Sequence, residues 1–191
     1  MIVESDISIT LGVSSCLLGE HVRFDGGHKL DYYISNTLGR YFRLLPVCPE
    51  VGCGLPVPRE AMHLEGDPAS PRLITGKTRI DLTVQMLDFC NAKVKELERE
   101  ELCGFIFKKN SPSCGIRVKA YKISGAGDIY KGLFAAEVTR HFPMMPVAEE
   151  EQLTDPLLRN HFIQRVLSYS DRSIKALETP ASALHCQQPH M

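Results

Sequence analysis

The protein has 191 residues, of which 43% are hydrophobic and 24% are charged, so it can bury one sizeable core. Its formal net charge of −1, with lysine and arginine scattered along the chain, disfavours a polymeric nucleic acid as a partner. The first residues lack the basic stretch and cleavage site of a signal peptide, and no apolar run approaches the ~20 residues that cross a bilayer. We therefore expect a cytoplasmic protein with no membrane partner.

Two short apolar runs in the first quarter of the chain each end at a cysteine. Residues 8–15 are rich in β-branched side chains and lead into Cys16, which predicts a buried strand followed by a functional loop. Residues 31–42 carry aromatic and aliphatic side chains at helical spacing and predict a helix. The run 44–47 predicts a second strand, which ends at Cys48.

The middle of the chain contrasts a long irregular stretch with a clear helix. Residues 49–77 contain five prolines and four glycines among sparse hydrophobic residues, and we expect a long ordered loop there. Residues 84–102 place apolar side chains on one face and glutamate and lysine on the other, as an amphipathic helix does. A strand at 104–107 follows and runs into the segment 108–115, which holds Cys114. A third predicted strand therefore ends in a third cysteine loop.

The remainder of the chain continues the alternation of strands and helices. It predicts, in order, a strand or loop at 116–130, a helix at 132–142, a short strand at 143–147 and a helix at 155–168. This alternation indicates an α/β fold with a mainly parallel sheet flanked by helices. We assign residues 1–150 to one domain and 151–191 to a C-terminal helical extension, whose last dozen polar residues we expect to be disordered.

Three cysteines at predicted strand ends suggest a common site. In open α/β sheets, ligands bind outside the carboxyl ends of the strands, so Cys16, Cys48 and Cys114 can converge although they lie far apart in the sequence. Disulfides are rare in a reducing cytoplasm, and the odd total of seven cysteines also argues against a disulfide framework. Three thiolates suit zinc with a further ligand or water, or an iron–sulfur cluster with one open iron, and the spacing does not choose between them.

The other four cysteines are weaker candidates. Cys90 on the apolar helix face and Cys103 beside a strand start are interpreted as small core residues, and Cys186 in the polar tail as a free thiol. Cys53 lies near enough to Cys48 for both to be ligands on one loop. The alternative function is a zinc-binding structural or interaction domain that uses Cys16, Cys48, Cys53 and Cys114. A thiol redox protein is disfavoured because no Cys-x-x-Cys pair is present.

Five short strings carry a resemblance to a known family. They are VSSCLLGE (13–20), VRFDGG (22–27), VCPEV (47–51), GLPVPR (54–59) and SPSCG (111–115). In order and spacing they resemble the thiouracil desulfidase family, over roughly residues 8–150. The segments 142–151, 155–159 and 162–165 look like the longer members, in which a second helical domain follows. The chain therefore resembles a shortened relative, or the first domain of such a protein.

The resemblance implies a 4Fe–4S cluster held by only three cysteines, which map onto Cys16, Cys48 and Cys114. The fourth iron would act as a Lewis acid toward a thiocarbonyl sulfur and favour hydrolytic replacement of sulfur by oxygen, with release of sulfide and no net redox change. The implied substrate is a small thiolated pyrimidine: a thiolated uracil base, nucleoside or nucleotide. Many short members have a further cysteine where this chain has Val22, and glycine is common where it has Cys53, so neither position enters the implied ligand set.

The family match also implies roles for polar residues of the motifs. Glu50 takes the role of general acid/base, whereas without the motif it is interpreted as an exposed loop carboxylate. Ser111 orients substrate or water, although Ser113 in the same turn could play that part instead. The residues implied to contact the substrate are Ser113, Arg23, Asp25 and Arg59, since arginine suits phosphate groups. A structural salt bridge between Arg23 and Asp25 is an equal alternative.

Overall fold

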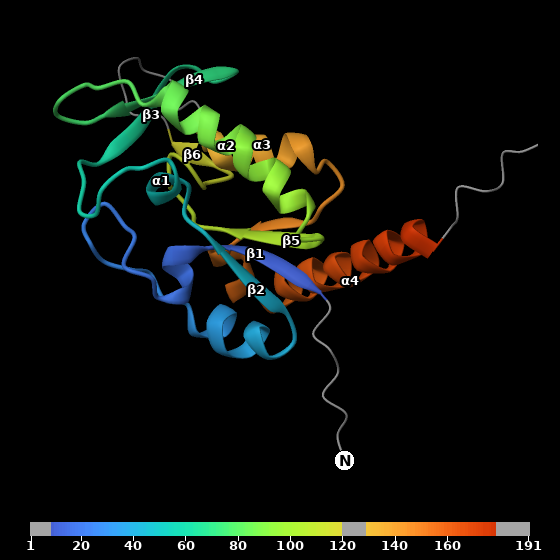
Figure 1. The fold of residues 1–191 in the computed structure, drawn as a ribbon. Helices are drawn as coiled ribbons and strands as arrows, with labels where there is room; N and C mark the ends of the chain where they lie inside the picture. The colour runs from blue at the N-terminus through green and yellow to red at the C-terminus, as the bar shows by residue number, and fades with distance from the viewer. Residues whose placement is uncertain (1–8, 120–128, 179–191) are drawn as a thin grey trace, which may run out of the picture.

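A parallel sheet forms the centre of the protein in the computed structural model, which describes residues 9–119 and 129–178. Four strands lie in the order β2-β1-β5-β8, and every neighbouring pair is parallel. Their bounds are Thr10–Ser14 for β1, Arg43–Val47 for β2, Leu102–Phe107 for β5 and Val147–Glu149 for β8. Helices lie on both sides of this sheet (Figure 1). The predicted α/β fold with a mainly parallel sheet is therefore confirmed.

The two central strands are buried on both faces. β1 and β5 are built mainly of apolar residues, and all of their residues are buried. This is the pattern of a parallel strand that helices cover on both sides. Gly12 in β1 leaves room for the Phe105 ring of β5 to pack against the β1 backbone, because a Cβ at position 12 would lie 2.3 Å from that ring.

The sheet separates two hydrophobic clusters. On one side, helices α2 and α3 pack against Phe105 and Phe107 of β5. On the other side, helix α4 and the helical turns η2 and η3 pack around Ile106, because successive side chains of a strand point to opposite faces. Their bounds are Thr83–Glu98 for α2, Leu133–His141 for α3, Pro156–Glu178 for α4, Tyr33–Thr37 for η2 and Leu38–Arg40 for η3.

Three predicted elements are present with different bounds. The helix expected at 31–42 is a π-helical turn, η2, followed by a 3-10 turn, η3, and each buries one side chain. Helix α4 continues past its expected end at residue 168 to Glu178. Strand β8 begins at Val147, where a strand was expected to end, because Pro146 before it has no N–H to donate to the sheet.

The long loop expected at 49–77 is wrong in part. The chain forms a short helix and an antiparallel hairpin there, with bounds Pro49–Gly52 for α1, Met62–Asp67 for β3 and Ser70–Thr75 for β4. Leu64 faces Leu73 across the hairpin, and both are buried in the hydrophobic cluster on the α2 side of the sheet, against which Met62 also packs. Proline is tolerated in a two-stranded sheet because both strands are edges, and Pro49 begins α1 where a missing N–H costs little.

Two predictions fall partly or wholly outside the described residues. Within 116–130, strand β6 (Val118–Lys119) pairs antiparallel with β7 (Ile129–Tyr130), and the residues between these strands are not described. The polar tail that was expected to be disordered, including Cys186, also lies outside the described ranges.

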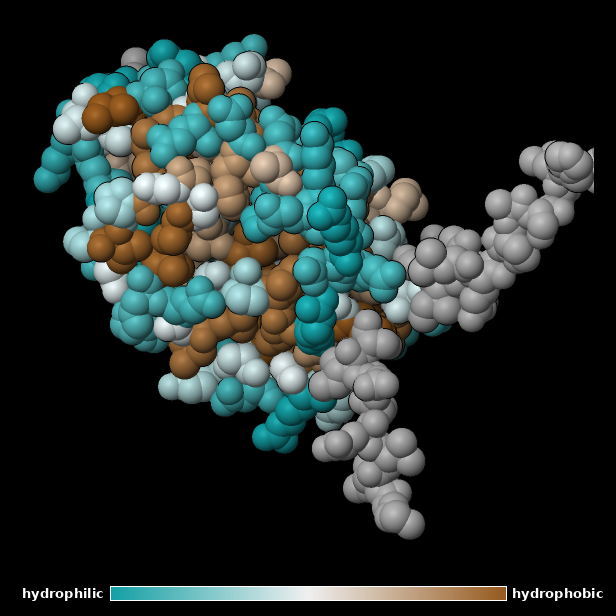
Figure 2. Space-filling model, in the orientation of Figure 1, coloured by the Kyte–Doolittle hydropathy of each residue, from teal (hydrophilic) through white to brown (hydrophobic). Residues whose placement is uncertain are grey.

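The surface carries both polar and apolar residues. On the face drawn in Figure 2, hydrophobic residues gather in a broad patch across the middle, bordered by hydrophilic residues. Among the described helices, none combines the length and the apolar character that would be needed to cross a membrane.

Candidate active site

A cavity of about 180 Å³ opens at the carboxyl ends of β1, β2 and β5. Cys16 lines it from the turn η1 (Ser15–Leu18) after β1, Cys48 from the residue after β2, and Cys114 from the loop after β5. We call these three residues the pocket cysteines and the space between them the strand-end cavity. The structure thus brings together at one place three thiols that the sequence separates widely.

Of the remaining sequence candidates, most lie at the same cavity. The lining includes Glu50 and Arg59 from the α1 region, Ser111 and Ser113 from the loop before Cys114, and Arg23. Asp25 and Cys53 are not part of the lining.

Two of the pocket cysteines, Cys16 and Cys114, are buried and Cys48 is half-buried, and burial raises the pKa of all three thiols. Burial raises the pKa of Cys16 to about 11, raises that of Cys48, and raises that of Cys114 well above its ordinary value. After burial, which raises the pKa of Cys114, and a hydrogen bond from Ser14, which lowers it, the charges of Glu50, Cys48 and Cys16 also raise it. The three sulfurs therefore lie within electrostatic reach of one another. A metal that binds here must therefore displace protons, so its affinity will depend on pH.

Cations around the cavity oppose the effect of burial. Burial is the largest influence on the pKa of Cys16, but Lys108 and Arg23 both lower it. Arg59 in the same way lowers the pKa of Cys48, which burial raises. Thiolates bound to a metal group concentrate negative charge, and these nearby cations would offset that charge.

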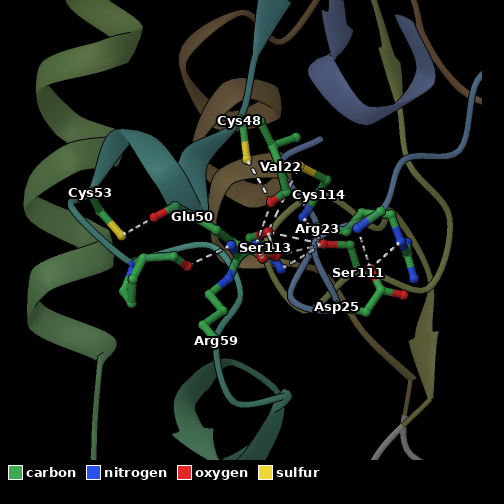
Figure 3. Close-up of polar contacts among 12 residues, drawn as sticks. Val22, Arg23, Asp25, Cys48, Glu50, Cys53, Arg59, Ser111, Ser113 and Cys114 are labelled. Carbon is green, nitrogen blue, oxygen red and sulfur yellow. Dashed lines mark hydrogen bonds and ion pairs between the residues drawn. The ribbon is translucent and has the colours of Figure 1, made fainter. Parts of the chain in front are cut away.

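Glu50 is held from both sides in the free protein. One carboxylate oxygen, Oε1, accepts a hydrogen bond from Ser113 Oγ at 2.7 Å and a longer one from Ser111 Oγ at 3.4 Å (Figure 3). The other, Oε2, forms an ion pair with Arg59 Nη2. Only 13% of the Glu50 side chain is exposed, so its carboxylate is directed into the site rather than into solvent.

The two serines have different environments within one turn. Ser111 Oγ accepts hydrogen bonds from the backbone N–H groups of Ser113 at 3.3 Å and Cys114 at 3.1 Å, so it closes the turn that presents the cysteine. Ser113 is 1% exposed, and its hydroxyl has the short contact to Glu50. Gly132 before α3 allows this turn to pack closely, because a Cβ there would lie 2.6 Å from the Ser113 carbonyl.

Arg23 and Asp25 lie on the loop between η1 and η2. Arg23 Nε is 3.4 Å from Asp25 Oδ1, which also accepts a hydrogen bond from Gly27 N at 3.0 Å. The Gly27 N–H and then Arg23 lower the pKa of Asp25, whose side chain is 48% exposed. Arg23 and Asp25 therefore form the salt bridge that was the alternative to a substrate contact. Arg23 is also one of the residues that line the cavity.

Cys53, Cys90 and Cys103 are not part of the lining of the strand-end cavity. Cys53 Sγ donates a hydrogen bond to the Glu50 carbonyl at 3.2 Å, and Figure 3 shows its sulfur turned toward α1. Cys90 and Cys103 are buried in the hydrophobic clusters on the two sides of the sheet, as expected for small core residues.

Sequence reasoning missed several residues of the cavity. Ser14 accepts a hydrogen bond from Lys108 N at 3.0 Å and lowers the pKa of Cys114, which burial raises. Its place two residues before Cys16 in the first motif was a usable signal. Met62 lines the cavity from β3 and was missed because its segment was interpreted as a loop, and Phe24 gave no pattern of its own.

Comparison with known proteins adds independent findings. None of the curated proteins matches this chain. Among solved structures, a [4Fe-4S]-dependent thiouracil desulfidase, TudS, matches with a TM-score of 0.65 and 29% sequence identity, covering 80% of this chain and 98% of its own. A family model described as 2-thiouracil desulfurase matches residues 11–150, and the resemblance noted in the sequence is thereby confirmed. With most of its length matched in this way, the chain belongs to the 2-thiouracil desulfurase family.

Proposed function

We propose that this protein is an iron–sulfur-dependent desulfidase that replaces the sulfur of a thiolated uracil base, nucleoside or nucleotide by oxygen and releases sulfide. One observation carries the proposal: three thiols and one oriented carboxylate, Glu50, line a single cavity at the strand ends. Membership of the family and the likeness to a [4Fe-4S]-dependent thiouracil desulfidase support it.

The donor set of the cavity fits a 4Fe–4S cluster with three protein ligands. The pocket cysteines supply three sulfur donors, the usual ligands of such clusters. Glu50 is engaged by Arg59 and Ser113, so three thiols leave one iron without a protein ligand. When bound, the cluster would supply a Lewis acid toward the thiocarbonyl sulfur of the substrate.

The residues of the chain supply positioning and proton transfer. The reaction needs water to attack the ring carbon, a C–O bond to form and the C–S bond to break, with sulfide leaving as the protonated species. Glu50 Oε1 faces the cavity next to the Ser113 hydroxyl, where the carboxylate can take a proton from the attacking water and return it to the leaving sulfur. The thiocarbonyl group and water give the lactam carbonyl of the pyrimidine and hydrogen sulfide, so no oxidant or reductant is needed.

The zinc alternative is less well supported. Its four-cysteine set requires Cys53, whose sulfur is directed to the carbonyl of Glu50 and does not line the cavity. Among the side chains of residues 9–119 and 129–171, no group of three or more Cys, His, Asp or Glu is arranged so that it could hold one metal ion. Without Cys53, the cavity offers a zinc ion only three of the four cysteines that this alternative requires.

Anaerobic reconstitution followed by a turnover assay tests the proposal. We expect iron and sulfide in the ratio of a 4Fe–4S cluster, and loss of the thione absorbance of 2-thiouracil or 4-thiouridine monophosphate with release of sulfide. The Glu50→Gln variant should keep its cluster and lose turnover, whereas Glu96→Gln should behave as the unmodified protein because the Glu96 side chain is 61% exposed on α2. A colourless protein that binds zinc and no sulfide would refute the cluster, and a loaded protein without turnover on any thiolated pyrimidine would refute the activity.

A further inference from the structure

Arg59 is an arginine in an unusual environment. Its side chain is only 4% exposed, although arginine is rarely buried unless it is paired. It lies in the irregular stretch between α1 and β3 and lines the strand-end cavity. Burying a guanidinium costs much desolvation energy, so its contacts are those that make its position stable.

The Arg59 side chain contacts the Glu50 carboxylate and two backbone carbonyls. Arg59 Nη2 binds Glu50 Oε2 and donates to the Val22 carbonyl at 2.9 Å, and Nη1 donates to the Pro56 carbonyl at 3.2 Å. The Arg59 backbone N–H donates to the Phe24 carbonyl at 2.8 Å. Of the guanidinium N–H groups, Nε is buried and has no partner among the described residues. Both terminal nitrogens of the guanidinium, Nη1 and Nη2, therefore donate to acceptors of the protein rather than pointing toward a substrate.

Arg59 and Ser113 together hold the Glu50 carboxylate in place. Glu50 lies on α1, a helix of four residues, which by itself does little to fix the rotamer of a long carboxylate side chain. Ser113 holds one carboxylate oxygen and Arg59 holds the other. Arg59 is in turn anchored by two backbone carbonyls, so its planar fork cannot rotate freely.

We propose that Arg59 is a positioning residue, which acts on the reaction by holding the Glu50 carboxylate toward Ser113 and the cavity rather than by touching the substrate. This inference rests on the proposed function, because it assigns Glu50 a role in turnover. Without the Arg59 guanidinium, the Glu50 carboxylate can rotate away from Ser113 and the cavity. Small misplacements of a reacting group can reduce the rate by about 100-fold.

The Arg59→Lys variant is the most informative test, because it keeps the positive charge and loses the fork. A lysine ammonium is a point charge on a flexible stem and cannot reproduce the planar contacts to Glu50 and the two carbonyls. We expect kcat per bound cluster to fall by about 10- to 100-fold with KM changed by less than about threefold. Arg59→Ala should lose more, and added guanidinium should restore part of its kcat. Arg140→Lys is the matched control, since Arg140 forms an exposed ion pair on α3.

A second measurement does not depend on turnover. In cluster-free protein, denaturant unfolding of Arg59→Ala, Glu50→Gln and the double variant should show non-additive changes, because each single change removes the same ion pair. Additive changes would overturn the proposal. It would also be overturned by an unchanged kcat in Arg59→Lys, by a raised KM with unchanged kcat, which indicates substrate contact, or by loss of activity only in proportion to lost iron. If the unmodified, loaded protein shows no turnover, the proposed function fails, whereas the unfolding cycle still reports on the Arg59–Glu50 link.

Discussion

Replacing each of the two serines in the SPSCG turn should separate catalysis from cluster binding. Ser113→Ala removes the hydroxyl that donates to Glu50 Oε1 at 2.7 Å. A hydrogen bond to a charged group contributes about 1.5–3 kcal/mol. Since each 1.4 kcal/mol changes a rate tenfold, we expect kcat per cluster to fall by about 10- to 100-fold if the bond orients the carboxylate in the transition state.

Ser111→Ala should behave differently because its hydroxyl serves the backbone. Its Oγ accepts from the N–H groups of Ser113 and Cys114, and removing it leaves buried donors without a partner. Each such group costs about 1–3 kcal/mol, and the cost falls on the turn that presents Cys114. We therefore expect lower stability and lower iron content, with nearly normal kcat for the clusters that remain.

The assay for both variants combines iron and sulfide analysis, turnover per bound cluster and denaturant unfolding. The comparison is decisive because the two changes remove the same atom two residues apart. If Ser111→Ala with a full cluster loses more kcat than Ser113→Ala, the assignment from contact distances is incorrect, and Ser111 has the orienting role that the family resemblance implies.

Three further predictions concern the ligands, the pH dependence and the packing of α4. Each of the substitutions Cys16→Ser, Cys48→Ser and Cys114→Ser should strongly reduce the bound iron and sulfide, whereas Cys53→Ser should leave both unchanged. Iron and sulfide analysis of the four variants measures this. In cluster-free protein, burial raises the pKa of Cys16 to about 11 and that of Cys90 to about 12, while unfolded thiols ionise near pH 9. The folded state then holds more protons, so the free energy of unfolding should fall above pH 9 by up to about 1.4 kcal/mol per pH unit for each thiol. Denaturant titrations from pH 8 to 11 measure this fall, and a flat profile would contradict it. Phe162→Ala on the buried face of α4 should cost about 3–5 kcal/mol, whereas Leu157→Ala, at a side chain 78% exposed, should change stability by less than about 0.5 kcal/mol.

Side-chain periodicity in the sequence predicted the strands and the helix whose burial pattern repeats along the chain. The continuous apolar runs before Cys16 and Cys48 and the run at 104–107 predicted β2 and the two buried central strands, because parallel strands covered on both faces need such runs. The amphipathic period predicted α2 within a few residues of its ends. The position of one cysteine at or in the loop after each of these strands nominated the three as a common site before any family was considered.

Tertiary structure alone decided the parts that depend on distant partners. In the hairpin β3–β4, Leu64 pairs with Leu73 and both are buried, a pairing that sparse hydrophobic residues among prolines do not reveal. Glu50 acquires its orientation from Ser113, 63 residues further along the chain, and from Arg59, whose guanidinium is anchored by the carbonyls of Val22 and Pro56. Sequence determined which residues stand at the strand ends, since side-chain periodicity is a local property. Only the fold determined which of them touch, because contacts between loops depend on how the strands are ordered in the sheet.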